Sequence, residues 1–466
     1  MGSLIGPSHT FSLRLILSIA WLPIFFHSPL HAEVLDDPPI GRHYDIPVII
    51  EILPPEDTYQ ISKSAVADLT GDGRSSVIYF GRTPGWSVGY DTDPQPLYIM
   101  IPNEDGILEN RVDDVLVGPR LVMQEGAHTI LPADFNNDGR TDLFFNVAGP
   151  EVDGLNDPGG QNLLLLMGED GRLTNVTATH LPQFSDKSHF STIGDYDGDG
   201  DVDIFVNILG GGPEEARESP GDSGYLMFND GTGHFTVVAD FGGTGPNAIV
   251  GPNGRLPENA NYSAWALVAV DADGDGDLDI YIGQAKETEF CSDYPNCSWG
   301  ATRVILMNEG DGRFLTVKDP MPDAGPLGQR VTIHTEFNQV YDVNNDGLDD
   351  LLLHQLDGPL FDSGEDAFFF QILVSNGDGT FRDETNSRYP NDFVGQLTQI
   401  ILHDLDRDGH KDIFTIVNYS FNDIRINDGE GYFRPLRSDW ITRVGSEFSI
   451  VMDVDGDGDT DFYDMG

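Results

Sequence analysis

The sequence predicts an all-β fold, and three observations lead to this prediction. A nine-residue acidic pattern, Asp-x-Asp/Asn-x-Asp-Gly-x-x-Asp, recurs along the chain, with Asp-Gly cores that begin at Asp72, Asp138, Asp199, Asp275, Asp346, Asp408 and Asp457. Short runs rich in β-branched residues flank the copies, as at 267–270 and 278–282, and such runs are typical of strands. A second hairpin motif separates consecutive copies. A period of this kind determines the architecture before any local feature does.

The acidic pattern is suited to a hard cation. In the fourth copy, carboxylates stand at positions 1, 3, 5 and 9 of the loop (Asp271, Asp273, Asp275 and Asp279), and Gly276 allows a sharp turn at position 6. With the backbone carbonyl at position 7, these oxygens match the six to eight ligands that calcium takes. The loops contain no sulfur and no paired histidines, which argues against zinc and copper. We therefore expect Ca²⁺ as the cofactor, at about six sites.

Six copies supply a complete ligand set, in which position 7 contributes its backbone carbonyl. The predicted ligands are Asp134, Asn136, Asp138, Arg140 and Asp142; Asp195, Asp197, Asp199, Asp201 and Asp203; Asp271, Asp273, Asp275, Asp277 and Asp279; Asp342, Asn344, Asp346, Leu348 and Asp350; Asp404, Asp406, Asp408, His410 and Asp412; and Asp453, Asp455, Asp457, Asp459 and Asp461. The first copy keeps Asp68 and Asp72 but has Thr70 and Ser76, so we expect weak binding or none there. A single Asp-Gly loop is often an ordinary turn. Repetition of the whole pattern favours the metal site.

These loops differ from EF-hands, which carry a glutamate at position 12 and lie between helices. Position 12 is apolar or Thr in copies two to six, namely Phe145, Val206, Ile282, Leu353 and Thr415. The second motif, such as Asn-Asp-Gly-Thr-Gly-His-Phe at 229–235, has the residues of a tight hairpin turn. Each unit therefore has four strands: A, calcium loop, B, connection, C, turn and D. Seven such units predict a seven-bladed β-propeller of four-stranded blades, with the calcium loops in the A–B hairpins.

The two ends of the chain bear on ring closure and on export. A basic Arg14, an apolar run over 15–26 and a plausible cleavage site after Ala32 predict a signal peptide at 1–32, the alternative being an N-terminal anchor. The propeller then covers 33–466. Because the last unit stops after strand B, we expect the strand near 43–53 to complete the last blade; otherwise this reading frame is a truncated form of a longer one. An exported chain would be secreted, periplasmic or on the cell surface.

Charge and cysteine content restrict the partners. The chain has 25 basic and 78 acidic residues and a formal charge of −53, which argues against nucleic acid and anionic membranes as partners. Cys291 and Cys297 are its two cysteines, and in an exported chain they are expected to form a disulfide, the alternative being two free thiols. No second hydrophobic segment follows the first, so no membrane span is expected after signal removal. We expect a monomer.

These motifs resemble FG-GAP/VCBS repeats, the blades of integrin α-subunit propellers and of many exported bacterial proteins. The segment 375–385, with its Asn-Gly-Asp-Gly-Thr-Phe core, also resembles the propeller of cartilage acidic protein relatives. The resemblance covers about residues 45 to 466 and implies a calcium-binding propeller. This chain departs from the integrin pattern because it shows no downstream domain and no Arg-Gly-Asp sequence.

A candidate pocket follows from the strand register. The residues six positions before the first aspartate of each loop should surround the central funnel on the face opposite the calcium loops, because each would lie about 20 Å from its loop. They are Ser62, His128, His189, Trp265, Glu336, Thr398 and Glu447. His128, His189, Trp265, Glu336 and Glu447 could form a pocket for a small polar ligand or a sugar. The alternative is that strands simply begin with polar residues.

Three functions are compatible with this sequence. The main hypothesis is an exported recognition or adhesion module whose loops bind an extracellular protein or glycan. The second is a polysaccharide lyase or another carbohydrate-active enzyme, since some lyases use similar propellers. A lyase needs a base and a group that neutralises a uronate carboxylate; the predicted ring has histidines but no arginine. We therefore expect no enzyme activity. The third is a purely structural surface protein, and the fold alone does not choose between the three.

Overall fold

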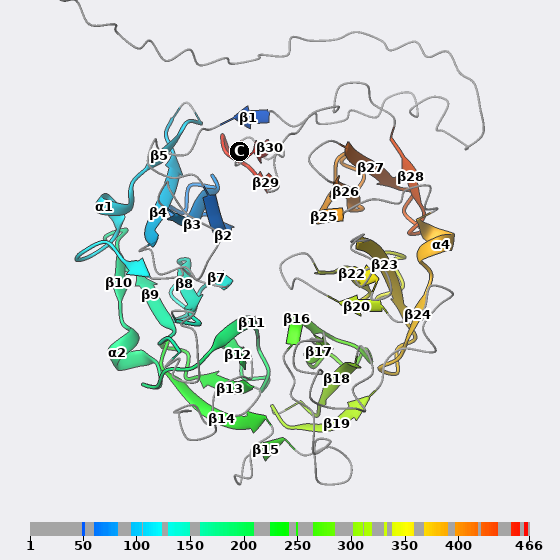
Figure 1. Cartoon of the computed structure of the whole chain (residues 1–466), viewed down its shortest axis with the longest axis horizontal. Coiled ribbons are helices and arrows are strands. Elements are labelled where there is room, and N and C mark those ends of the chain that lie inside the picture. The colour runs from blue at the N-terminus through cyan, green and yellow to red at the C-terminus, as the bar shows by residue number, and fades with distance from the viewer. Residues whose placement is uncertain are drawn as a thin grey trace, which may run out of the picture.

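The computed structural model describes residues 49–51, 60–82, 95–104, 106–123, 129–149, 159–208, 224–241, 248–249, 264–284, 302–310, 312–318, 330–332, 338–357, 368–389, 397–417, 421–436, 449–456 and 461–464. Within these ranges the chain forms seven β-sheets, most of them antiparallel and four-stranded or five-stranded. Figure 1 shows that the sheets follow one another in chain order around a common centre, with the first strand of each sequence repeat nearest to it. The arrangement is all-β and propeller-like.

Each sheet corresponds to one sequence repeat. The first three repeats contain β2 (Gln60–Ala67), β3 (Ser76–Arg82), β4 (Gln95–Pro102), β5 (Leu108–Asn110) and β6 (Val122–Met123); β7 (Thr129–Ala133), β8 (Asp142–Asn146), β9 (Leu163–Met167) and β10 (Leu173–Asn175); and β11 (Ser188–Gly194), β12 (Asp203–Ile208), β13 (Gly224–Asn229), β14 (Phe235–Phe241) and β15 (Ala248–Ile249). The fourth contains β16 (Ala264–Val270), β17 (Asp279–Gln284), β18 (Thr302–Asn308) and β19 (Phe314–Lys318).

The remaining repeats follow the same order. The fifth contains β20 (Arg330–Thr332), β21 (Gln339–Val340), β22 (Leu351–Asp357), β23 (Phe368–Ser375) and β24 (Phe381–Asp383). The sixth contains β25 (Leu397–His403), β26 (Asp412–Val417), β27 (Phe421–Asn427) and β28 (Phe433–Pro435), and the seventh β29 (Ser449–Met452) and β30 (Asp461–Asp464). In six repeats the acidic loop lies between the first two strands, as predicted; in the fifth it lies between β21 and β22, because the short β20 precedes both.

The hydrophobic core lies between neighbouring sheets. In β3, Ile78 and Phe80 pack with Leu143 and Phe145 of the second repeat. Their neighbours along β3 face the other way: Val77 belongs to the cluster that includes Met452 and Val454 of the seventh repeat. Successive side chains of a strand point to opposite faces of the sheet, so second strands such as β3, β8 and β12 bury both faces and are largely apolar.

The first and last repeats are in direct contact. Besides the shared apolar cluster, the Ser75 amide donates a hydrogen bond to the Asp453 carbonyl at 2.7 Å. The strand β1 (Ile49–Glu51) pairs in parallel with β30, with Ile49 opposite Phe462. A strand from the predicted 43–53 region therefore lies in the sheet of the last repeat (Figure 1).

Several elements differ from the uniform four-strand unit. Short extra strands enlarge three sheets: β6 pairs with β4, β15 pairs in parallel with β14, and both β20 and β21 pair with β22. One-turn helices follow the fourth strand in three repeats: α1 (Val112–Val115), α2 (Thr177–His180) and α4 (Thr385–Arg388). In the described part of the chain, no helix has the length and apolar character needed to cross a membrane.

The candidate metal loops and the contacts between repeats

The loop backbone is shaped by its first aspartate. Asp134 accepts hydrogen bonds from the amide of Asp138 at 3.0 Å and of Gly139 at 2.7 Å. The same two contacts recur in the third, fifth and sixth repeats. Gly139 has a φ of +80°, a conformation that glycine adopts without steric cost. The pattern Asp-x-x-x-Asp-Gly thus encodes a tight loop whose amides point inward to one carboxylate.

Three loops bring their carboxylates together at one point. In each group, one oxygen per residue lies within 4.8 Å of the others: Asp195, Asp197 and Asp199; Asp271, Asp273 and Asp275; and Asp404, Asp406 and Asp412. Oxygen ligands alone, gathered this closely, match the donor set of Ca²⁺. The residues present therefore fit a calcium ion, and the groups include positions 1, 3, 5 and 9 of the predicted pattern.

Electrostatics within a loop oppose full ionisation. Burial raises the pKa of Asp197, and the charges of Asp199 and Asp195 raise it further. Like charges that share a small volume disfavour one another, and a divalent cation among them reverses this effect. A cation bound among these carboxylates would therefore relieve their mutual repulsion.

The aspartate at position 9 is also a structural residue. In the third repeat, Asp203 is fully buried, and its two oxygens accept the amides of Tyr196 and Asn229, each at 2.9 Å. Equivalent pairs of bonds hold the other buried carboxylates of this position, Asp142, Asp279, Asp350 and Asp412. Burial raises the pKa of these groups to about 6 for Asp142 and Asp350 and about 7 for Asp203, Asp279 and Asp412. Position 9 thus ties the loop to the third strand of its own sheet.

The first repeat lacks this connection. Ser76 takes position 9 there; it is fully buried, and its hydroxyl makes no hydrogen bond. At position 7, Arg74 forms an ion pair with Asp72 of the same loop, and Arg140 forms the equivalent pair with Asp138 in the second repeat. The Arg74 ion pair lowers the pKa of Asp72.

The asparagine that opens the second motif has a role that the sequence analysis did not assign. Asn308 donates from Nδ2 to the Tyr196 carbonyl of the preceding repeat at 2.8 Å, and its Oδ1 accepts the Gly310 amide at 3.2 Å. Asn229 makes the same contact to the Phe135 carbonyl at 2.7 Å. The motif therefore joins neighbouring repeats as well as closing its own turn. Its recurring Asn was visible in the sequence, but the partner in another repeat was not.

Comparison with known families agrees with this repeat structure. The model of the FG-GAP-like repeat matches residues 134–206, 342–415 and 404–463. The chain is an FG-GAP repeat protein. The predicted FG-GAP repeats are confirmed, whereas the likeness to integrin α-subunit propellers stays a prediction. The three matched segments include the loops of the second, third, fifth, sixth and seventh repeats.

Solved structures show only a distant likeness to this FG-GAP repeat protein. BBS1N, from its complex with ARL6DN, is 9% identical over 81% of this chain and 92% of that chain, with a TM-score of 0.34. The rhamnogalacturonan lyase YesW is 13% identical over 85% and 71%, with a TM-score of 0.33. Bacillus licheniformis rhamnogalacturonan lyase PL11 is 12% identical over 85% and 72%, with a TM-score of 0.32. No curated protein matches the chain significantly.

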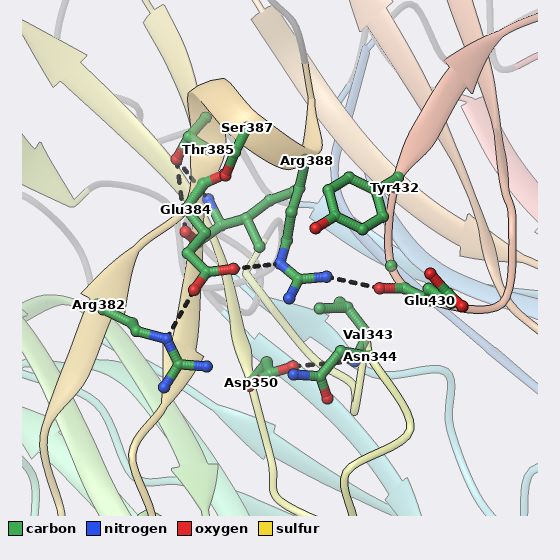
Figure 2. A network of polar contacts seen from close by, with 12 residues as sticks. Val343, Asn344, Asp350, Arg382, Glu384, Thr385, Ser387, Arg388, Glu430 and Tyr432 are labelled. Atoms are coloured by element: carbon green, nitrogen blue, oxygen red, sulfur yellow. Dashed lines mark hydrogen bonds and ion pairs between the residues drawn. The ribbon is translucent and has the colours of Figure 1, made fainter.

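A second kind of contact links FG-GAP repeats through the short helices. In Figure 2, Arg388 at the end of α4 points to the turn of the sixth repeat. Its guanidinium pairs with Glu384 at 2.7 Å and donates to the Glu430 carbonyl at 2.8 Å, with its Cζ 5.2 Å from the centre of the Tyr432 ring. Arg388 is only 7% exposed. The helix is thus a connector between repeats.

The same position in the second repeat is a histidine. His180 ends α2, and its ring stacks on His234 in the turn of the third repeat, with centroids 3.7 Å apart and planes 20° apart. These helices were missed in the sequence. The sequence did contain a signal for them, because Asn175 and Asp383 stand two residues before the start of a helix. Each side chain accepts a hydrogen bond from the backbone amide two residues later, at 3.1 Å and 3.0 Å.

The remaining predicted site residues are placed only in part. Ser62, His189, Trp265 and Thr398 belong to the innermost strands β2, β11, β16 and β25 (Figure 1). The His189 ring packs edge-on against Phe190, with centroids 4.3 Å apart. The other candidates lie outside the described residues: His128, Glu336, Glu447, Asp457, Asp459, Cys291, Cys297 and the predicted signal peptide 1–32.

Proposed function

We propose that this chain is an exported, calcium-stabilised seven-bladed β-propeller that acts as a recognition module for an extracellular protein or glycan. The observation that carries the proposal is the convergence of three carboxylates within 4.8 Å in each of three loops. Such clusters are costly without a counter-ion, and the same cluster in loops of three different repeats indicates a common ligand. Calcium, when bound, supplies positive charge and a template that orders the loop.

The ligands in each loop would be the side chains at positions 1, 3, 5 and 9 and the carbonyl at position 7. In the third repeat these are Asp195, Asp197, Asp199 and Asp203, with the carbonyl of Asp201. Asp203 already accepts two amides, but each carboxylate oxygen has a second lone pair for a metal. The first loop, with Thr70 and Ser76, would be the weakest site.

Contacts between the first and last repeats support closure into a seven-bladed ring. Met452 and Val454 pack with Val77 and Tyr79, and the Ser75 amide bonds to Asp453. A closed ring leaves its sheets without long exposed edges, and it provides a rigid scaffold whose loops can bind a partner. We expect the ring to be a monomer.

The recognition role is supported by charge and by the nature of the scaffold. A formal charge of −53 repels polyanions, so the expected ligand is a protein with basic groups or a glycan without dense negative charge. The signal-like segment at the N-terminus would place the protein outside the cytoplasm, where calcium is abundant enough to fill such loops.

Calcium stoichiometry tests the metal part of the proposal. Equilibrium dialysis of residues 33–466 should retain about six calcium ions per chain. Asp195→Ala should remove one ion, whereas Asp170→Ala, an exposed aspartate in the turn of the second repeat, should remove none. No retained calcium would refute the proposal. Arrays of glycans and extracellular proteins, probed with the calcium-loaded chain, then test recognition; cleavage of a glycan instead of binding would indicate the enzyme hypothesis.

A further inference from the structure

Neighbouring acidic loops touch each other through two fixed positions. The side chain at position 4 of one loop contacts the residue at position 7 of the next loop along the chain. Asn137 of the second repeat donates from Nδ2 to Oδ1 of Asp201 in the third, at 2.5 Å. Asn345 of the fifth repeat places its Nδ2 3.0 Å from Nδ1 of His410 in the sixth. The two pairs occupy the same positions although their chemistry differs.

The contact persists where position 4 is glycine. A Cβ added to Gly274 would lie 2.7 Å from Cδ2 of Leu348, the position 7 residue of the next loop. A Cβ on Gly456 in the last loop would lie 3.0 Å from Cγ of Arg74 in the first. The side chain at position 7 therefore fills the space that the glycine leaves. Among the described loops there are two exceptions. A Cβ on Gly71 would meet nothing within 4 Å, and a Cβ on Gly198 in the third loop would meet only the carbonyl oxygen of Gly310, at 3.5 Å, and not the position 7 residue of the fourth loop.

A further bond links the fourth and fifth loops. Asp349, at position 8 of the fifth loop, accepts the backbone amide of Asp271 at 3.1 Å. Asp271 is the first predicted ligand of the fourth loop. The backbone of one candidate site is thus held directly by a side chain of the next site.

We propose that calcium binding is cooperative between adjacent loops, through these contacts between position 4 and position 7. The inference rests on the proposed calcium function. The carbonyl of position 7 is a predicted ligand, and position 4 lies between ligand positions 3 and 5. An ion in one loop fixes the backbone of its position 7, which orders position 4 of the preceding loop before that loop binds. A site that is already ordered binds with a smaller entropic cost, which produces positive coupling. Coupling is weakest between the first and second loops and between the third and fourth, because a Cβ at Gly71 or Gly198 would not meet the position 7 residue of the next loop.

The experiment is a calcium titration of residues 33–466, read by native mass spectrometry and by calorimetry. The test variant is Asn137→Gly. Glycine suits the φ of +55° at this position and occurs there in four other repeats, so the loop can form while the amide contact to Asp201 is lost. The matched control is Gly71→Asn, the reverse change at the same loop position, where the space is open. Asn345→Gly is a second test variant, in case the first alters folding.

The unmodified chain should show few partly filled species and a Hill coefficient above 1. In Asn137→Gly and Asn345→Gly the partly filled species should increase, and affinity at the uncoupled pair of loops should fall about five-fold or more. Gly71→Asn should behave as the unmodified chain does. A binomial distribution of bound ions in the unmodified chain, or equal behaviour of all three variants, would overturn the inference while leaving the proposed function in place. Absence of calcium binding would instead refute the proposed function.

Discussion

Gly431→Ala tests the contact between the fifth and sixth repeats. Gly431 lies in the turn of the sixth repeat with a φ of +82°, directly beside the Arg388 side chain. A Cβ at this position would lie 2.3 Å from Nη1 of Arg388 and 2.6 Å from the Val343 carbonyl oxygen. The arginine could move, but the carbonyl belongs to the buried start of the fifth acidic loop. The added methyl group therefore separates the two repeats.

The chain offers a matched control at the same position of another repeat. Gly171 has a φ of +71°, and a Cβ there would meet nothing within 4 Å. Gly171→Ala should lower the free energy of unfolding by about 1–2 kcal/mol, because alanine is strained in the left-handed backbone conformation. Gly431→Ala should add about 1–3 kcal/mol of overpacking and about 1.5–3 kcal/mol for the lost bond from Arg388 to the Glu430 carbonyl. The difference between the two variants should therefore be at least about 2.5 kcal/mol.

Equilibrium unfolding in urea, followed by tryptophan fluorescence with calcium present, measures this difference. Both variants are expected to remain folded, with a lower midpoint for Gly431→Ala and an unchanged dependence on urea concentration. Equal losses of stability in the two variants would show that the helix-to-turn contact is not packed as described, and would refute the reasoning for this joint.

Three further predictions concern buried or paired groups. Burial and the neighbouring His234 lower the pKa of His180 below 6.5, so its contribution to stability is present above that pH and lost on acidification. His180→Gln should therefore make the melting temperature less dependent on pH in this range, and an unchanged pH dependence would contradict the prediction. Burial raises the pKa of Asp186 from 3.8 to about 6, so the contribution of this carboxyl to the stability of the fold decreases as the pH rises from about 4 to above 6. The Asp186→Asn variant should therefore have a higher melting temperature than the unmodified chain above pH 6 but not at pH 4. Asn229→Ala should destabilise the protein by about 1 kcal/mol more than Asn427→Ala, because Asn229 bonds to the preceding repeat; equal denaturation midpoints would argue against that bond.

The repeat pattern predicted much of the fold because its signals are local. The strands around each acidic loop, the turn at positions such as Gly139, and the hairpin after Asn229 all follow from residues within about ten positions of one another. The tight loop and its inward carboxylates were likewise predictable, because an Asp-Gly pair with aspartates at alternate positions leaves few other conformations.

Contacts between repeats could not be predicted in the same way. Asn308 bonds to Tyr196, which lies 112 residues earlier, and spacing alone does not show which carbonyl it reaches. The double role of Asp203 at position 9 was also missed, because its bond to Asn229 depends on how the third strand returns to the loop. Local sequence determines which groups are available, and their partners are determined by packing around the ring.

Thermal unfolding of residues 33–466, with and without a calcium chelator, tests the central claim most directly. At a free calcium concentration of 100 times the dissociation constant, each site adds about 2.7 kcal/mol to the free energy of unfolding. Several sites together should therefore raise the melting temperature by tens of degrees. The account predicts a drop of that size on chelation, restored by calcium but not by magnesium, which demands a more rigid octahedral site. A melting temperature that the chelator leaves unchanged would contradict the account.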